Sequence, residues 1–359
     1  MIATTNDEPV IVHDIGGTWW RSAIVDANGA LTHPVRYPAV TRAGTGRHPS
    51  TLRELLVRYL LDRTWTLLAR YPGVRRVGIS LGAAINATTG QVMASAPLWG
   101  DALDPFDLRA VLTAAEPGLI WCVASDVTCL VVAIAAQGEV QAQGWRCLTG
   151  VTVSTGIAAR TIDVASGVVL VDPIHGIQGE IGHLPALSPP PPGTVAAELI
   201  CDCGATGHIA AISSGAAIER NLAQLSSILD VTDSPNPPMP LLARLHTALQ
   251  NESASAAAFL DASTAPVALG LLYLLTIDPR VDHVYVTGGV VDMLGEHWMA
   301  SLYRTLEHHG LYLASTHQPS IFRERITRLD ADGHEPMRGA ARLALDSTAP
   351  AARQALEAP

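Results

Sequence analysis

The sequence predicts a two-domain α/β protein, and three observations support this fold class. The chain has 359 residues, too many for one small core and enough for two domains of ordinary size. Residues 9–29 and 148–170 share one outline, an apolar strand, a small-residue turn and a second strand. Elsewhere, stretches with helical spacing alternate with short apolar strands. We therefore expect two similar lobes, each opening on a β-hairpin.

The first lobe can be followed element by element. PVIVHD (residues 9–14) is an apolar strand that ends in an acid, and the turn GGT leads to the strand WWRSAIVDANG, which closes on Asn-Gly. TLRELLVRYLLDRTWTLLARYPG (51–73) carries leucines at helical spacing with Gly73 as a stop. VRRVGISLG then predicts a buried strand. LIWCVAS predicts a strand that runs into the helix DVTCLVVAIAAQGE.

The second lobe begins with LTGVTVS, the turn STG and the strand IAARTIDVASGVVLVD. HVYVTGGVV predicts a strand and a turn, and HEPMRGAARLALDS a final helix. LSPPPPGT (187–194) is a polyproline linker that is too stiff for helix or strand. The apolar stretches LIWCVASDVTCLVVAIAA and APVALGLLYLLTI are interrupted by Asp126 or too short to span a bilayer, so we expect core.

Composition excludes several classes of function. The formal charge is −10 and there is no run of basic residues, which argues against nucleic acid as a partner. All 23 basic residues are arginine, so no mechanism can use a catalytic lysine. The N-terminal stretch MIATTNDEPVIVHD lacks the pattern of a secretory signal, and we expect a cytoplasmic protein without a membrane partner. Five cysteines, two of them in a C-x-C pair, argue for reduced thiols or a metal site rather than a disulfide framework.

Three glycine-containing turns are candidates for nucleotide binding. Asp14-Ile-Gly16-Gly17-Thr18 offers an acid at a strand end and accessible backbone N–H groups, which together can hold magnesium and approach phosphate. Ser154-Thr155-Gly156 repeats this arrangement in the second lobe. Gly288-Gly289 follows an apolar strand and could form the floor of an adenosine pocket. Each turn alone is better explained as a strand connection, whereas all three together favour a nucleotide site.

Asp126 is the candidate general base. It lies among apolar residues at the predicted strand-to-helix junction, where an aspartate is either a helix N-cap or an acid that faces a ligand. The local sequence favours the cap. The helix N-terminus would keep the carboxylate ionised, as a base requires.

Four residues are candidate zinc ligands. His183 ends the motif GEIGH (179–183), and Cys201, Cys203 and His208 belong to CDCGATGH (201–208). Two imidazoles and two thiolates suit tetrahedral zinc, and a complete set of protein ligands makes the zinc structural. The alternative is that a cysteine pair and two solvent-facing histidines coincide by chance.

The chain resembles the ROK family of sugar kinases, relatives of hexokinase with the two-lobed actin-like ATPase (ribonuclease H-like) fold. The resemblance extends from Asp14 to the final helix through the motifs SAPLWGD, ASDVTC, STGIAA, GEIGHLP, CDCGATGH, VTGGVV and MRGAARLA. The zinc element is the most specific of these, with His208 in place of the family's last cysteine. The resemblance implies a small domain of residues 1–125, completed by helix 336–359, and a large domain of residues 126–335.

The family's activity implies ATP- and magnesium-dependent phosphorylation of a sugar hydroxyl, with Asp126 as base, and a homodimer. Asp14 would hold magnesium, and five residues would bind phosphates: Gly16, Gly17, Thr18, Thr155 and Gly156. Gly288 and Gly289 would lie on the adenosine side. The acceptor would contact Glu180, His183 and Ser125, the last in place of the family's asparagine next to the base.

Departures from the family concern the acceptor. Ala210 replaces a second sugar-binding glutamate, Ala96-Pro97-Leu98-Trp99 lacks the family's asparagine, and Ala158 stands where glycine is usual. Each lost polar partner leaves a hexose hydroxyl unsatisfied, at a cost of about 1–3 kcal/mol. The residues therefore favour an acceptor other than an ordinary hexose. The family is also similar to kinases of C7 cyclitols, and this resemblance implies a C7 cyclitol of the valiolone type as acceptor. The alternatives are a hexose or N-acetylhexosamine kinase, a non-catalytic sugar or nucleotide sensor, and an acyl phosphotransferase.

Overall fold

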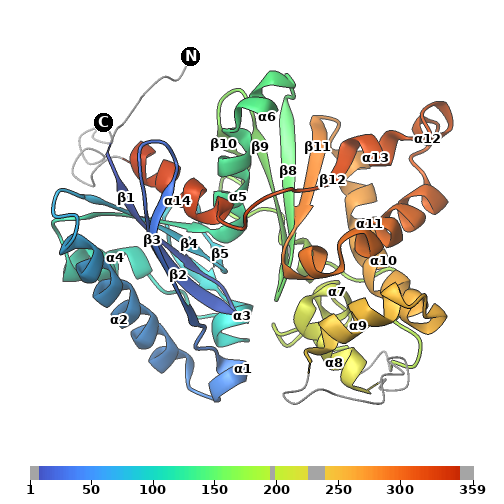
Figure 1. Cartoon of the computed structure of the whole chain (residues 1–359), viewed down its shortest axis with the longest axis horizontal. Coiled ribbons are helices and arrows are strands. Elements are labelled where there is room, and N and C mark those ends of the chain that lie inside the picture. The colour runs from blue at the N-terminus through green and yellow to red at the C-terminus, as the bar shows by residue number, and fades with distance from the viewer. Residues whose placement is uncertain (1–7, 195–198, 225–238, 348–359) are drawn as a thin grey trace. The chain divides into compact units, whose positions relative to one another are not determined.

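The computed structural model divides the chain into two compact units and describes residues 8–194, 199–224 and 239–347 (Figure 1). Unit 1 consists of Met1–Ala142, Val169–Gln178 and Ala331–Pro359. Unit 2 consists of Gln143–Val168 and Gly179–Asp330. The chain thus leaves unit 1, returns to it briefly, and comes back to it at its end.

Unit 1 is a five-stranded sheet with helices on both faces. Its sheet has the order β3-β2-β1-β4-β7, in which β1, β2 and β3 are antiparallel and β1, β4 and β7 are parallel. The strands of this sheet are β1 (Val10–Ile15), β2 (Trp19–Val25), β3 (Leu31–Pro38), β4 (Arg76–Leu81) and β7 (Ile120–Ser125). Strands β5 (Ala84–Ile85) and β6 (Val92–Ala94) form a separate two-stranded sheet. The helices are α1 (Arg42–Thr45), α2 (Pro49–Leu68), α3 (Ala96–Trp99), α4 (Leu108–Ala115), α5 (Asp126–Ala135), α6 (Gly138–Ala142) and α14 (Glu335–Asp346).

Alternation along β1 explains how both faces of this sheet are covered. Successive side chains of a strand point to opposite faces. Ile11 and Ile15 pack with leucines of α2 and α4, whereas Val10 and Val12 pack with Met337 and its neighbours on α14. In Figure 1, α2 and α4 lie on one side of the sheet and α14 and α5 on the other. A strand buried on both faces is largely apolar, as the run Val10–Val12 of β1 is.

Unit 2 repeats the sheet order of unit 1 with β10-β9-β8-β11-β12. Here β8 and β9 are antiparallel, and β8, β11 and β12 are parallel. The strands are β8 (Cys147–Val153), β9 (Ile157–Asp163), β10 (Val168–Val169), β11 (Val281–Thr287) and β12 (Ile326–Arg328). The helices are η1 (Ile181–His183, a 3₁₀ turn), α7 (Ala210–Ser213), α8 (Gly215–Gln224), α9 (Leu241–Gln250), α10 (Ala254–Ile277), α11 (Gly289–His309), α12 (Ala314–His317) and α13 (Ile321–Arg325).

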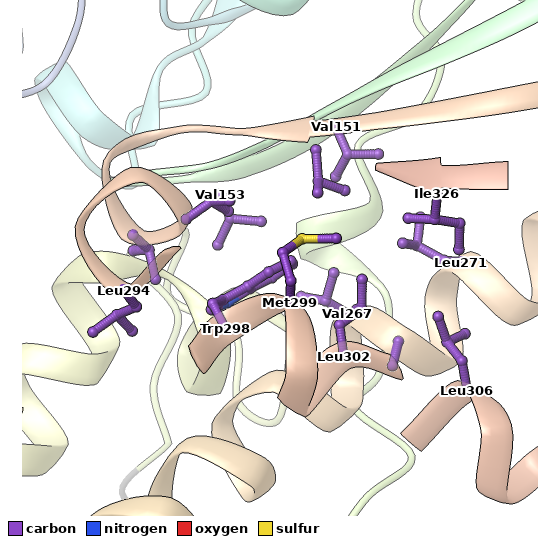
Figure 2. Packing of buried hydrophobic residues seen from close by; sticks show 14 of the residues in the cluster. Val151, Val153, Val267, Leu271, Leu294, Trp298, Met299, Leu302, Leu306 and Ile326 are labelled. Atoms are coloured by element: carbon purple, nitrogen blue, oxygen red, sulfur yellow. The ribbon is translucent and has the colours of Figure 1, made fainter. Parts of the chain in front are cut away.

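The core of unit 2 lies between its sheet and the long helices α10 and α11 (Figure 2). Trp298 and Met299 of α11 fill its centre, against Val151 and Val153 of β8 and Val267 of α10. All five side chains are at most 3 % exposed. Large buried side chains from both layers therefore hold the helices on the sheet.

Helix α10 corrects one expectation about length. APVALGLLYLLTI is the second half of a 24-residue helix, which is long and apolar enough to cross a membrane. Phe259, Leu260 and Leu271 of this helix are nevertheless buried in the core of unit 2. The stretch is therefore part of the core, as expected. The expectation that it is too short to span a bilayer is wrong, because it belongs to a longer helix.

Both predicted hairpins form, and the predicted helices and strands are present with shifted boundaries. Helix α2 begins at Pro49 and ends at Leu68, five residues before the expected stop at Gly73. Residues 187–194 form neither helix nor strand, as expected of the proline run. Of the predicted final helix 336–359, α14 accounts for residues up to Asp346, and residues 348–359 lie outside the described part of the chain.

The domain boundaries differ from the expected 1–125 and 126–335. Residues 126–142, including α5, belong to unit 1, as do residues 169–178. The reason is the packing of α5 against α14. A Cβ on Gly339 of α14 would lie 1.7 Å from the carbonyl oxygen of Cys129 in α5, and a Cβ on Gly78 of β4 would lie 2.3 Å from that of Ala340. These backbone contacts require glycine and fasten α5 and α14 to the same sheet.

Gly339→Ala is predicted to destabilise unit 1, because the added methyl group forces α5 and α14 apart. Overpacking of this kind costs about 1–3 kcal/mol, and the midpoint of thermal unfolding should fall by several degrees. Gly138→Ala is the control, since nothing lies within 4 Å of a Cβ at that position in the same unit. Equal midpoints for the two variants would contradict this packing.

Candidate functional site

The functional residues predicted in the first lobe gather at one edge of the unit 1 sheet. Ile15 of β1 pairs with Leu81 of β4, which pairs with Ser125 of β7, so the carboxyl ends of three parallel strands are level. The first glycine turn follows β1 at this edge, where Gly16 N–H donates to the carbonyl of Trp19 at 3.0 Å. Asp126 follows β7 at the same edge. Ligands of open α/β sheets bind beyond the carboxyl ends of parallel strands.

Asp14 is buried beneath the first glycine turn. Ser80 of β4 donates a hydrogen bond of 2.7 Å to its Oδ1, and Arg21 Nε lies 3.2 Å from its Oδ2. Burial raises the pKa of Asp14, while the positive charge of Arg21 and the Ser80 hydrogen bond lower it. Arg21 is the cross-strand partner of Asp14 in the β1–β2 hairpin. Sequence reasoning missed Arg21, although the predicted hairpin contained the signal.

Asp126 is the first residue of α5, and the expected N-cap role belongs to its neighbour. Ser125 Oγ accepts the Thr128 N–H at 3.3 Å and donates to Thr128 Oγ1 at 2.8 Å, and Ser125 is 3 % exposed. The Ser125 hydroxyl is thus buried and caps the helix, and its expected contact with the acceptor stays a prediction. Asp126 Oδ1 accepts the N–H of Val127 at 2.8 Å.

Gly82 connects Asp126 with the first glycine turn. A Cβ on Gly82 would lie 3.7 Å from the Cα of Gly16 and 3.8 Å from Asp126 Oδ2, and the Gly82 N–H donates to Ile15 at 2.8 Å. Unit 1 therefore brings the candidate base to the turn that follows Asp14. Sequence reasoning missed Gly82, because only the strand register shows that the end of β4 lies between Asp126 and the first glycine turn.

The second and third glycine turns also meet, at the corresponding edge of the unit 2 sheet. Gly288 has φ +111°, and a Cβ there would lie 2.5 Å from the Val153 carbonyl, immediately before Ser154-Thr155-Gly156. The N–H of Gly215, where α8 begins, donates to the Ser154 carbonyl at 2.7 Å. Helices α8 and α11 thus both begin at this turn, and helix N-termini favour anions. Gly215 was not predicted.

The backbone of the motif GEIGH packs closely against the backbone of β9. A Cβ on Gly179 would be 2.0 Å from the Ala159 carbonyl oxygen, and one on Gly182 would be 2.5 Å from that of Ile157. These contacts fix the backbone on either side of Glu180. Its carboxylate accepts a hydrogen bond of 2.8 Å from the buried Arg160, a partner that local sequence does not reveal because twenty residues separate the two.

The four predicted metal ligands come together in unit 2. The donor atoms of His183, Cys201, Cys203 and His208 all lie within 4.8 Å of one another. Cys201 Sγ is 3.8 Å from His183 Nδ1, and Cys203 Sγ is 3.4 Å from His208 Nδ1. Ligands at normal zinc distances in a tetrahedron are about 3.3–3.8 Å apart. The donor set fits zinc, and these two sulfur–nitrogen distances fall in that range.

Local backbone bonds build this cluster. The Cys201 N–H donates to Ala205 and the Gly204 N–H donates to Cys201, both at 2.8 Å, which closes a tight turn around the cysteines. Burial raises the pKa of the Cys201 thiol to about 11, and burial together with the charge of His183 lowers the pKa of His208. A cation would favour the thiolate, since thiolates are the metal-binding form.

Positions where polar family residues are lost are occupied by apolar side chains. Leu98 is 2 % exposed and packs in the core of unit 1. Ala210 is the first residue of α7, next to the zinc-ligand candidates. Neither offers a hydrogen bond to a ligand.

The repeated sheet with two glycine-containing edges fits the actin-like ATPase fold. The chain belongs to the ROK family, whose pattern matches residues 10–347.

Two relatives are similar to this chain in sequence. The chain is 38 % identical over 351 residues to the 2-epi-5-epi-valiolone 7-kinase of Actinoplanes sp., covering 94 % of this chain and 93 % of that protein. It is 31 % identical over 224 residues to a C(7)-cyclitol 7-kinase of Streptomyces hygroscopicus, covering 57 % of this chain and 55 % of that protein. Among solved structures, the ROK family glucokinase of Streptomyces griseus in complex with glucose and AMPPNP has a TM-score of 0.68 at 19 % identity, covering 94 % and 100 % of the two chains.

Gly288→Ala is predicted to destabilise unit 2, whereas Gly289→Ala is not. An alanine at position 288 would need a backbone conformation restricted to glycine, at a cost of about 1–3 kcal/mol, and would press on Val153. Gly289 is the first residue of α11 and has open space around it. Thermal unfolding of both variants tests this, and a Gly288→Ala protein as stable as Gly289→Ala would show that the turn tolerates a side chain.

Proposed function

We propose that this protein is an ATP- and magnesium-dependent kinase that phosphorylates a hydroxyl of a C7 cyclitol of the valiolone type. The kinase chemistry is supported chiefly by one geometric observation, that Asp126 lies beside the glycine turn after Asp14, at the carboxyl edge of β1, β4 and β7. The acceptor class is supported by the similarity to the valiolone kinase over nearly the whole of both chains.

Asp126 would act as the general base. It would accept the proton of the acceptor hydroxyl while the acceptor oxygen bonds to the γ-phosphorus and the bond from that phosphorus to the bridging oxygen of ADP breaks. Its position at the first turn of α5 favours the ionised carboxylate that this role needs.

The three glycine-containing turns would bind the nucleotide. Gly16, Gly17 and Thr18 would bind phosphates in unit 1, and Thr155 with Gly156 would do so in unit 2. Gly288 and Gly289 would lie on the adenosine side, and the N-termini of α8 and α11 would favour the negative charge of the phosphates. Asp14 would hold magnesium, which neutralises charge on the transferred phosphoryl group.

The acceptor would contact Glu180 and His183. The backbone contacts of Gly179 and Gly182 with β9 hold the segment that carries both residues. With Nδ1 facing Cys201, His183 keeps Nε2 for an acceptor hydroxyl. Because Ala210 and Leu98 supply no polar partner, an acceptor that differs from an ordinary hexose fits this set better.

The function is tested by acceptor-dependent release of ADP in the presence of magnesium, across hexoses, N-acetylhexosamines, inositols and C7 cyclitols. We expect the highest kcat/KM with a valiolone-type cyclitol. Faster turnover with glucose, mannose or an N-acetylhexosamine would favour the hexose kinase alternative. A wild-type protein that binds ligand but turns over no acceptor would favour a sensor.

Asp126→Asn provides the matched control for this assay, since the amide keeps the shape of the side chain and removes the base. We expect kcat to fall about 10²- to 10⁴-fold, the usual contribution of a general base. Full activity of Asp126→Asn would mean that another group accepts the proton.

We also propose that His183, Cys201, Cys203 and His208 hold one structural zinc ion. The purified protein should contain about one zinc per chain, and the pair Cys201→Ser with Cys203→Ser should lose it and unfold at a lower temperature. Cys122→Ser, which lies on β7 and outside this cluster, should retain the metal. Folded wild-type protein without metal would contradict the proposal.

A further inference from the structure

Arg160 is a buried arginine whose role the proposed reaction leaves open. It lies on β9, and its side chain is 2 % exposed. Nη1 donates to the Ala159 carbonyl and Nη2 donates to Glu180 Oε1, both at 2.8 Å. A buried guanidinium is costly unless it is paired and hydrogen-bonded. Glu180 is the carboxylate that pairs with it.

The strand explains how an arginine comes to this position. Ile157 and Ala159 of β9 pack in the core of unit 2, so alternation places Arg160 on the opposite face of the sheet. Its partner across β8 is Gly150, which has no side chain to occupy that face. The guanidinium extends beneath the GEIGH segment, where Nη1 lies 3.4 Å from the Cβ position of Gly179.

The ion pair with Arg160 restricts the side chain of Glu180, whereas the glycine contacts restrict only its backbone. The glycine contacts with β9 fix the segment, but a glutamate side chain retains three rotatable bonds. Oε1 of Glu180 accepts the hydrogen bond from Arg160, while the side chain is 28 % exposed and so remains accessible to solvent. Holding a binding group in one rotamer lowers the entropy lost when a ligand binds.

We propose that Arg160 is a positioning residue that sets the carboxylate of Glu180 for the acceptor, and so contributes to acceptor specificity. The inference rests on the proposed function, in which Glu180 binds the acceptor. Arg160 itself is too buried to touch a ligand, and therefore acts through Glu180. Its loss should weaken acceptor binding and leave nucleotide binding unchanged.

The test compares steady-state kinetics of five variants with the preferred acceptor of the panel: Arg160→Met, Arg160→Lys, Glu180→Gln, the double variant Arg160→Met/Glu180→Gln, and the control Arg304→Met. Arg304 pairs with Asp261 on the surface of unit 2. Arg160→Met should lower kcat/KM for the acceptor about 10- to 100-fold, as expected for a lost hydrogen bond to a charged group, through a higher acceptor KM with an unchanged KM for ATP. Arg304→Met should match the wild type.

The double variant separates positioning from an independent effect. If Arg160 acts only through Glu180, the double variant should be no worse than Glu180→Gln alone. Additive losses of kcat/KM in the double variant would overturn the inference. Equal increases in the KM for the acceptor and the KM for ATP would overturn it as well. If Arg160→Met fails to fold, Arg160→Lys replaces it in the test. Lysine keeps the positive charge but cannot donate two hydrogen bonds from a planar guanidinium, so kcat/KM for the acceptor should fall by a smaller factor.

The outcomes distinguish this inference from the proposed function. Wild-type turnover of a cyclitol, with Arg160→Met and Arg160→Lys both indistinguishable from Arg304→Met, would overturn the role of Arg160 alone. Absence of turnover by the wild type with every acceptor would overturn the proposed kinase and this role together.

Discussion

Contact between a glycine and the backbone of a neighbouring element is the constraint on which both units depend. In unit 1, Gly339 lies against Cys129 and so brings α14 onto α5, the helix that begins with Asp126. In unit 2, Gly288 lies against Val153 and Gly179 against Ala159. A side chain at any of these positions would separate elements that carry candidate functional groups. The same contacts therefore determine the packing and the position of the site.

Among the described residues, each unit also pairs a carboxylate with an arginine beside its candidate site, with burial distributed in opposite ways. In unit 1 the acid, Asp14, is buried, and Arg21 is partly exposed. In unit 2 the arginine, Arg160, is buried, and Glu180 is partly exposed. In the proposed function, the buried Asp14 would exchange Arg21 for magnesium, whereas the buried Arg160 would stay paired with Glu180 while Glu180 binds the acceptor.

The cluster of candidate metal ligands would add a third constraint next to the proposed acceptor-binding residues. His183 belongs to the same short segment as Glu180, and its Nδ1 faces Cys201. A metal held there would fix one end of the segment, while the glycine contacts with β9 fix its backbone. The acceptor residues would then be held by metal, backbone packing and the Arg160 pair, which is how a binding site becomes rigid before its ligand arrives.

The sequence alone determined the local features, because they depend on neighbouring residues. Alternation and glycine turns predicted both hairpins, helical spacing predicted α2 and α14, and ligand chemistry predicted the cluster of His183, Cys201, Cys203 and His208, which the structure brings within 4.8 Å. The tertiary structure decided what depends on distant segments. Strand register placed Gly82 between Gly16 and Asp126, packing on α14 assigned α5 to unit 1, and the path of GEIGH over β9 joined Glu180 to Arg160. Such pairs are set by burial and shape across many residues, which no local pattern records.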